Sequence, residues 1–328
     1  MLSSILQTLP QVLIDGLALG AIYAVVALGY TMVYGILELI NFAHGEIFMT
    51  GAFIGTSVLF LSQQMGWGGA MPAWLLYPII ILAAMMFTGL LGVGIERAAY
   101  RPLRKAPKLI SLIAAFGVSF VLQDVVRFIT ELKTGNYIIN SSSLYSERIT
   151  VPTSSISGAF GDASLKMNTV IILLITVLLM VGLDLFVNRT KWGVAMRAVA
   201  QDRETASLMS INVNKVIMLT FFIGSALGGA TGVLFAQQYG TIDPYIGFIL
   251  GLKAFTAAVL GGIGNIRGAM FGGLVIGLLE MFASSNLGLL TNGNFGAEYK
   301  DVFAFLILIV VLIFKPEGLF GKALKEKV

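Results

Sequence analysis

Nine apolar stretches, most of them long enough to cross a lipid bilayer, recur along this chain of 328 residues. A membrane-spanning helix needs about 20 consecutive, mainly apolar residues. Continuous apolar stretches indicate helices, because the strands of a membrane barrel alternate between apolar and polar residues. We therefore predict an all-α polytopic membrane protein with about eight to ten transmembrane or re-entrant helices. The stretches cover residues 12–34, 47–64, 74–95, 109–130, 169–187, 216–238, 248–262, 269–286 and 301–314.

Two of these stretches, 248–262 and 301–314, are short for a span unless flanking residues extend them. One or both are therefore predicted to be broken or re-entrant helices. Glycines at 261, 262 and 264, followed by Asn265, predict a break between the seventh and eighth stretches. Broken helices often mark binding sites in membrane transporters. Glycines also let helices pack closely in lipid, so both interpretations of this segment stay open.

The composition excludes several classes of protein. Charged residues make up 12% of the chain and mean hydropathy is +0.90, whereas soluble domains carry about 25% charged residues. With no cysteine and one histidine, the chain cannot form a disulfide, a Cys/His catalytic pair or a multi-histidine metal site. The net charge of +4 arises in loops beside apolar stretches, which indicates a lipid bilayer rather than nucleic acid as the partner.

Basic residues predict the orientation of the chain, because short loops rich in Lys and Arg stay on the cytoplasmic side. We expect a single transmembrane domain over residues 1–328, with 131–168 facing outward and 188–215 in the cytoplasm. The first basic residue is Arg97, so we expect a retained first span rather than a cleaved signal, with the amino terminus outside. Fourteen of the 21 basic residues lie in three segments: Arg97, Arg101, Arg104, Lys105 and Lys108; Arg189, Lys191, Arg197, Arg203 and Lys215; and Lys315, Lys322, Lys325 and Lys327.

The chain has no nucleotide-binding loop of the P-loop kind. That loop needs a glycine, four further residues and then Gly-Lys followed by Ser or Thr. The Gly321-Lys322 pair is followed by Ala323 and lacks the upstream glycine. We therefore predict a transport subunit, not an enzyme, that does not hydrolyse nucleotide itself.

The segment 188–215 has mixed charges, many helix-forming residues and an incomplete apolar face. A short amphipathic helix of this kind, outside the bilayer between two spans, can dock into a groove on a partner. A solvated loop fixed by its basic residues fits the pattern equally well.

Several motifs resemble one known permease family. They are G-x-A-x-R-A-x-A-x-D-x-x-x-A-S-L-x-x-I-N from Gly193 to Asn212, Y-T-M-V-Y-G-I-L-E-L-I-N-F-A-H-G-E from Tyr30 to Glu46, I-E-R-A-A-Y-R-P-L-R from Ile95 to Arg104, the stretch from Tyr239 to Ala269, and E-Y-K-D-V from Glu298 to Val302. Together they resemble the permeases of ATP-binding-cassette importers for branched-chain amino acids, and the similarity extends over essentially the whole chain.

This resemblance implies a multi-pass permease subunit in a bacterial inner membrane. It implies a homologous second permease, two cytoplasmic ATPase subunits that bind ATP and Mg, and a periplasmic solute-binding protein that delivers leucine, isoleucine or valine. No cofactor is expected on this chain. Two alternatives stay open: a permease of the same family for urea, short amides or other amino acids, and an ion-gradient-driven secondary transporter. The second would use intramembrane acids, for which Asp15, Asp124, Asp184 and Glu280 are candidates.

In the resembled family, the segment after the fifth apolar stretch is a cytoplasmic coupling helix that meets the ATPase. Ser210 departs from the family pattern, which often has glycine before the isoleucine. Glycine adopts a left-handed turn freely and serine does so at a cost. The resemblance assigns ATPase coupling to Arg197, Asp202, Glu204, Ala206 and Ile211.

Candidate residues of the translocation pathway or its gate are polar residues close to apolar stretches. Ionisable groups at membrane depth usually face a cavity or a partner. For the first three, the alternative is a short turn that caps the next helix. Lys253 either attracts a substrate carboxylate or extends to the outer interface near Asp243, and its position favours the second. The candidates are Asn41, His44, Glu46, Lys253 and Asn265.

Overall fold

The computed structural model is predominantly helical, which confirms the predicted all-α polytopic architecture. In the described part of the chain, seven helices are long and apolar enough to cross a membrane. They are α1 (Leu2–Leu37), α2 (Ala43–Gln64), α4 (Ala73–Ile95, continued to Leu103), α6 (Lys108–Thr134), α7 (Met167–Arg189), α10 (Val213–Tyr239) and α12 (Ile266–Leu290). The structure describes residues 2–37, 39, 41–67, 71–104, 106–155, 157–315 and 317–321.

The two stretches that looked short in the sequence form short helices. Helix α11 (Ile246–Gly261) has 16 residues and α13 (Lys300–Phe314) has 15, against about 20 for a full span. The predicted break after α11 is confirmed. Gly262 and Gly264 both adopt positive φ (97° and 88°) before α12 begins, a conformation that suits glycine because it lacks a Cβ.

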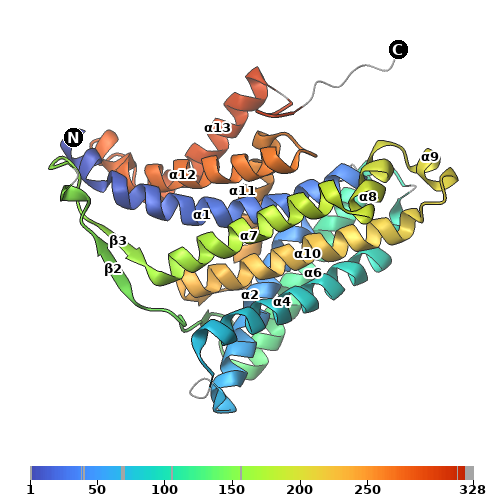
Figure 1. Cartoon of the computed structure of the whole chain (residues 1–328), viewed down its shortest axis with the longest axis horizontal. Coiled ribbons are helices and arrows are strands. Elements are labelled where there is room, and N and C mark those ends of the chain that lie inside the picture. The colour runs from blue at the N-terminus through green and yellow to red at the C-terminus, as the bar shows by residue number, and fades with distance from the viewer. Residues whose placement is uncertain are drawn as a thin grey trace. The chain divides into compact units, whose positions relative to one another are not determined.

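The chain divides into two compact units. Unit 2 comprises residues 28–144 and 178–252, and α10 lies at its centre, packed against α2 and α4. Figure 1 shows α10 running alongside α4. The contact between α10 and α2 is very close, since a Cβ on Gly51 or Gly232 would collide with the other helix. Close approach of small residues replaces the hydrophobic effect as the source of packing energy in lipid.

Unit 1 comprises residues 1–27, 145–177 and 253–328 as far as they are described. Within it, the first part of α1 packs against α12, and a Cβ on Gly20 or Gly277 would strike the backbone of the opposite helix. Helix α13 and the 3-10 turn η3 (Ala297–Tyr299) also pack against α12.

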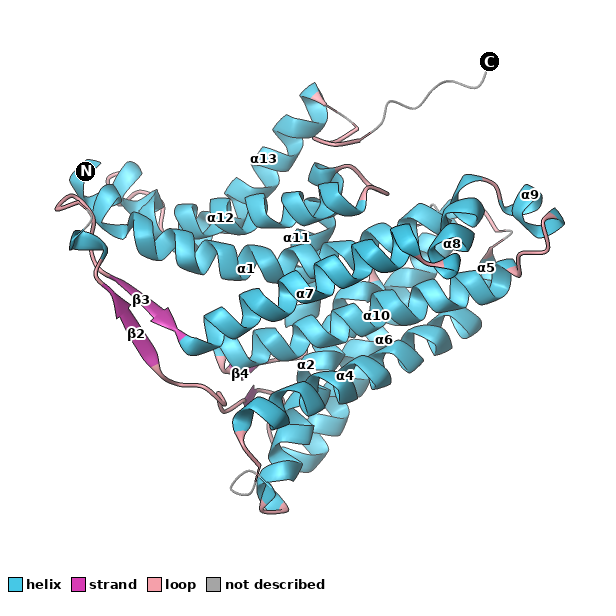
Figure 2. Cartoon of the chain, in the orientation of Figure 1, coloured by secondary structure: helices cyan, strands magenta, loops and turns pink. Residues whose placement is uncertain are grey.

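Three short strands of the described part of the chain lie between the end of α6 at Thr134 and the start of α7 at Met167. Strands β2 (Arg148–Val151) and β3 (Ala163–Lys166) pair antiparallel in unit 1 and are drawn in magenta in Figure 2. In unit 2, β1 (Ile139–Asn140) pairs with β4 (Thr241–Ile242). Beyond β2, the turn η2 (Thr153–Ser155) is fixed by Asp162, whose pKa is held below its usual value by hydrogen bonds from the Ser154 hydroxyl and backbone N–H.

Candidate functional site

The segment expected to meet an ATPase forms two short helices, not one. Helix α8 (Lys191–Gln201) ends at Asp202, and α9 (Arg203–Leu208) begins there. The Asp202 carboxylate accepts hydrogen bonds from the backbone N–H groups of Glu204 and Thr205, so it caps α9. Thr190 caps α8 and Asn212 caps α10 in the same way. Each cap satisfies N–H groups that a helix start leaves without an intrahelical acceptor.

The end of α9 is a Schellman motif. The Ile211 N–H donates to the Ala206 carbonyl and the Ser210 N–H donates to the Ser207 carbonyl, each at 3.2 Å. This pattern requires a left-handed residue at the position of Ser210, and Ser210 has φ of 63°. Serine therefore adopts the turn that glycine favours, and Ala206 and Ile211 are linked directly through the backbone.

Replacing Ser210 with glycine is expected to stabilise this turn by about 0.5–1 kcal/mol, because glycine removes the steric cost of positive φ. Valine at the same position should destabilise it, since a β-branched residue tolerates positive φ poorly. Hydrogen exchange at the Ile211 amide, in the purified protein, measures both effects. Faster exchange in Ser210→Gly than in the parent chain would contradict the assignment.

Two arginines attach the α8–α9 segment to the ends of other helices in unit 2. The Arg197 guanidinium donates to the Val187 carbonyl near the end of α7, and the Arg203 guanidinium donates to the Ile36 carbonyl at the end of α1, at 2.6 Å. Carbonyls in the last turn of a helix lack intrahelical donors and carry partial negative charge, so cations stabilise them. The predicted coupling residue Arg197 thus has a visible role as an anchor.

The end of α9 exposes two adjacent apolar side chains, Leu208 and Met209, beside the exposed polar residues Glu204, Thr205 and Ser207. Leu208 is 84% exposed and Met209 is 73% exposed, while Ala206 is 4% exposed and faces unit 2. Glu204 is exposed as well, and Ile211 is half-buried. Figure 1 shows α9 at the end of unit 2 where α10 begins. Adjacent exposed apolar side chains on an anchored helix are suited to docking against another protein.

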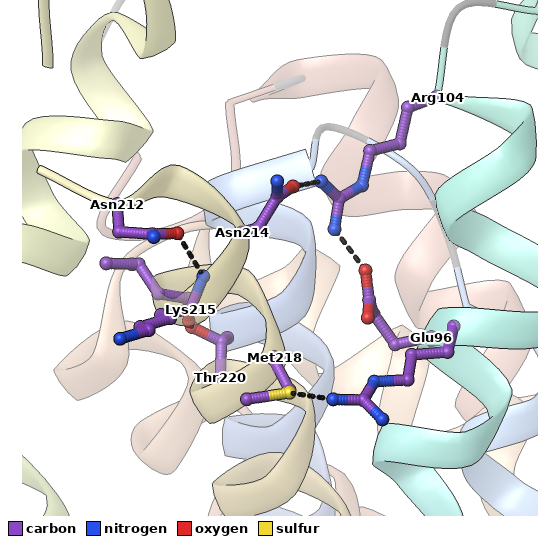
Figure 3. A network of polar contacts seen from close by, with 9 residues as sticks. Glu96, Arg104, Asn212, Asn214, Lys215, Met218 and Thr220 are labelled. Atoms are coloured by element: carbon purple, nitrogen blue, oxygen red, sulfur yellow. Dashed lines mark hydrogen bonds and ion pairs between the residues drawn. The ribbon is translucent and has the colours of Figure 1, made fainter. Parts of the chain in front are cut away.

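A polar network connects the 97–104 segment to the start of α10. Figure 3 shows the Arg104 guanidinium between Asn214 and Glu96. Arg104 donates to the Asn214 side-chain oxygen at 2.6 Å and forms an ion pair with Glu96 of the π-helix η1 (Glu96–Tyr100), ahead of the short α5 (Arg101–Leu103). Burial lowers the pKa of Arg104, an effect that Glu96 opposes. Two basic segments far apart in sequence therefore meet at one end of unit 2.

Asn41, His44 and Glu46 are all buried within unit 2 and do not form an exposed turn. The Tyr100 hydroxyl donates to the Asn41 side-chain oxygen at 2.7 Å. The His44 ring packs edge-on against Tyr30, with centroids 4.7 Å apart. The capping interpretation is wrong for Asn41, because α2 begins after Phe42 and lacks a side-chain cap.

Glu46 is buried among helices of unit 2. Its Oε1 accepts hydrogen bonds from the Ser119 hydroxyl (3.1 Å) and the Gln123 amide (3.0 Å) of α6. Its Oε2 is buried without a hydrogen-bond partner among the described residues, and the start of α11 lies so close that a Cβ on Gly247 would meet it at 2.5 Å. A buried carboxylate with one unsatisfied oxygen is costly, which is consistent with a group that gains another contact in a different conformation.

The expectation that Lys253 extends to the outer interface is wrong. Lys253 is buried in unit 1, where its ammonium group lies 2.8 Å from Glu280 Oε1 and 2.7 Å from Asp301 Oδ1. The Tyr23 hydroxyl donates to Glu280 Oε2 at 2.8 Å, and Lys300 lies 3.5 Å from Oε1. Lys253 pairs with buried acids of the same unit and does not extend to the membrane interface, because an unpaired charge in lipid is costly.

Asn265 caps helix α12 in unit 1. Its side-chain oxygen accepts from the Gly268 N–H at 3.1 Å, and its amide donates to the Phe320 carbonyl at 2.9 Å. The Leu319 N–H donates to the Leu260 carbonyl at 2.7 Å. The break between α11 and α12 is therefore occupied by the segment that follows α13.

The chain matches the family model described as "Branched-chain amino acid transport system / permease component" over residues 12–312. It is 42% identical over 330 residues to the high-affinity branched-chain amino acid transport system permease protein of Pseudomonas aeruginosa, with 97% of each chain covered. It is 42% identical over 318 residues, again with 97% of each covered, to the permease protein of the same description from Escherichia coli K12. A probable branched-chain amino acid transport permease of Methanocaldococcus jannaschii is 26% identical over 306 residues, which is 90% of this chain and 87% of the relative. No solved structure matches the chain significantly.

Proposed function

The chain belongs to the permease component family of branched-chain amino acid transport systems, and from that membership we propose that it moves leucine, isoleucine and valine across a bacterial inner membrane. It is a multi-pass transport subunit of an ATP-binding-cassette system. The substrate assignment is supported by two relatives at 42% identity whose descriptions name branched-chain amino acids.

The proposed transporter contains this chain, a homologous second permease, two cytoplasmic ATPases and a periplasmic solute-binding protein. The ATPases bind ATP and Mg, and this chain binds neither. Residues 1–328 form one permease domain in this proposal, with 188–215 in the cytoplasm and 131–168 outside. The meeting of the basic segments 97–104 and 189–215 at one end of unit 2 supports this orientation.

The observation that best supports the proposal is the anchored α9 with the exposed apolar Leu208 and Met209 at its end. Leu208 and Met209 dock against an ATPase, and Arg197 and Arg203 transmit its movement to the ends of α7 and α1. Asp202 and Ala206 fix the shape of the docking helix, because they cap it and bury its inner face. Glu204 and Ile211 flank this surface.

The buried Asn41, His44 and Glu46 cluster is assigned to the translocation pathway or its gate. It draws on α1, α2, α4, α6 and α11, so relative movement of these helices changes its contacts. The contacts of Lys253 and Asn265 favour structural roles within unit 1.

Replacing Leu208 with aspartate is expected to weaken ATPase association by about tenfold or more, because an aromatic or apolar hot-spot residue contributes about 2 kcal/mol or more to an interface. The measurement is co-purification of the ATPases with the tagged permease, together with ATP-driven uptake in proteoliposomes. Ile138→Asp is the matched control, since Ile138 is also an exposed apolar residue and lies outside the helices suited to span the bilayer.

Normal co-purification and uptake with Leu208→Asp would overturn the docking assignment. Uptake by the purified permease alone, driven by an ion gradient, would overturn the proposed class of transporter. Uptake of urea or a short amide in place of leucine would leave the class standing and replace the substrate.

A further inference from the structure

Unit 2 contains a cavity at the end where the α8–α9 segment lies. Its volume is about 440 Å³, within the range of about 300–1,000 Å³ typical of small-molecule sites. The end of α1, the residues after α5 and the junction of α8 with α9 form its walls. The lining residues are Ile36, Leu37, Leu39, Arg104, Ala106, Val199, Ala200, Gln201, Asp202, Arg203 and Glu204.

Two guanidinium groups line this cavity. Arg104 directs two nitrogens at Glu96 and Asn214 (Figure 3), but its buried Nε has no hydrogen-bond partner among the described residues. Arg203 donates one nitrogen to the Ile36 carbonyl, so further N–H donors of this fork are left for a ligand. The charges of Arg101 and Arg203 also contribute to lowering the pKa of Arg104, after the larger effect of burial. A carboxylate between the two groups would relieve their repulsion and accept from the remaining N–H donors of Arg203.

The rest of the cavity offers a negative charge and an apolar wall. The Glu204 carboxylate takes no hydrogen bond or ion pair from the part of the chain that the structure describes. Both oxygens of Asp202 are already used to cap α9. Among the apolar lining residues, Ile36, Leu37 and Val199 are buried, whereas Leu39 and Ala106 are half-buried and Ala200 is exposed, so these last three present the accessible apolar surface. The cavity therefore combines donors for a carboxylate, an acceptor for an ammonium group and a surface for an aliphatic side chain.

We propose that this cavity is a binding site for a free amino acid with a branched aliphatic side chain, the product of transport. The carboxylate contacts Arg104 and Arg203, the ammonium group faces Glu204, and the side chain packs on Leu39, Ala106 and Ala200. Because Arg203 and Glu204 belong to α9, an occupied cavity resists movement of the docking helix relative to α1. Accumulated product then slows its own import. The identity of the ligand rests on the proposed function.

The full-length chain in nanodiscs, titrated with L-leucine by calorimetry, tests the site. Arg203→Gln removes a donor for the carboxylate, and Ala106→Phe fills the cavity while both arginines remain. Each is expected to weaken leucine binding by about tenfold or more. Arg189→Gln is the matched control, because Arg189 is an exposed arginine outside the cavity lining and is not among the charges that act on Arg104, and leucine binding should stay unchanged.

Ligand analogues separate the sources of affinity. Isocaproate, which lacks the ammonium group, and isoamylamine, which lacks the carboxylate, should each bind about tenfold or more weakly than leucine. Unchanged leucine binding in Ala106→Phe would overturn the proposal. So would displacement of leucine by inorganic phosphate at equal concentration, which would indicate an anion site only.

A second measurement links the site to transport. In proteoliposomes of the assembled transporter, leucine on the ATP side should slow uptake, and Ala106→Phe should abolish that inhibition. Inhibition that persists in Ala106→Phe contradicts the proposal. Absence of ATP-driven uptake without added product would instead contradict the proposed function, while the nanodisc titration would still decide whether the cavity binds leucine.

Discussion

Glutamate in place of Ala206 is expected to reduce ATP-driven uptake by about tenfold or more, a loss that corresponds to about 1.4 kcal/mol of docking free energy. Ala206 is buried, and its carbonyl accepts the Ile211 N–H that closes the α9 turn. A charged side chain there must leave the protein interior, because an unpaired buried charge is strongly destabilising. Helix α9 then moves away from unit 2 and carries Leu208 and Met209 with it.

The measurement is uptake at matched amounts of membrane-inserted protein. Ala206→Ser is the control, since serine is small enough to occupy the same space. Insertion itself should be unaffected, because α9 lies outside the apolar helices suited to span the bilayer. Full uptake by Ala206→Glu would show that the inner face of α9 is not needed for coupling.

Replacing Lys253 with methionine should destabilise the protein by about 3–5 kcal/mol, as for other buried ion pairs that lose one partner. The Glu280 carboxylate, 2% exposed as a side chain, would then be a buried acid whose nearest cation is Lys300 at 3.5 Å. That remaining cation places the expected loss toward the lower end of the range. The midpoint of thermal denaturation in a fixed detergent measures the change.

The double variant Lys253→Met, Glu280→Gln separates the ion pair from the packing. Glutamine keeps an oxygen that can accept from the Tyr23 hydroxyl, and it removes the unpaired charge. We expect the double variant to recover much of the lost stability, since replacing both charges of a buried pair is often neutral, although Asp301, 36% exposed, keeps its charge and still loses Lys253. Equal destabilisation of the single and double variants would show that the charge of Glu280 is not the cause.

The spans were predictable from the sequence because they depend on local patterns, whereas the pattern of residues 188–215 fitted a short helix and a solvated loop equally well. Length and continuity of apolar residues identify a spanning helix without any tertiary information. The glycines after residue 260 indicated a break for the same reason, since positive φ at Gly262 and Gly264 is a local property. Ser210 departs from the family pattern and yet adopts the left-handed turn, so the departure changes the cost of the turn and not its shape.

The partners of buried polar groups were not predictable, because they come from residues far apart in the chain. Glu280 was noted as an intramembrane acid, but nothing near it in sequence indicates Lys253 or Tyr23. Ser119 and Gln123, which hold Glu46, lie more than 70 positions from it. The break at Asp202 was missed for another reason. Asp202 was read as a coupling residue, although an aspartate before three helix-forming residues is also a helix-start signal.

The α8–α9 segment links the proposed docking residues Leu208 and Met209 to the apolar helices and to the adjoining cavity. Thr190, Asp202 and Asn212 fix its helix starts, and Arg197 and Arg203 bind it to the ends of α7 and α1. Movement imposed on Leu208 and Met209 therefore reaches the apolar helices through hydrogen bonds to their last turns. The same anchoring makes the adjoining cavity a suitable place for a ligand to oppose that movement.

The chain has no cysteine of its own. Labelling of a single introduced cysteine therefore tests whether α9 lies in the cytoplasm and is covered by the ATPases. Leu208→Cys is exposed to a membrane-impermeant thiol reagent in vesicles of either orientation. The control is Ser146→Cys, in the segment 131–168 that is proposed to face outside. We expect labelling of Leu208→Cys only from the cytoplasmic side, and loss of that labelling once the ATPases assemble. Labelling from the outside, or labelling unchanged by the ATPases, would contradict this expectation.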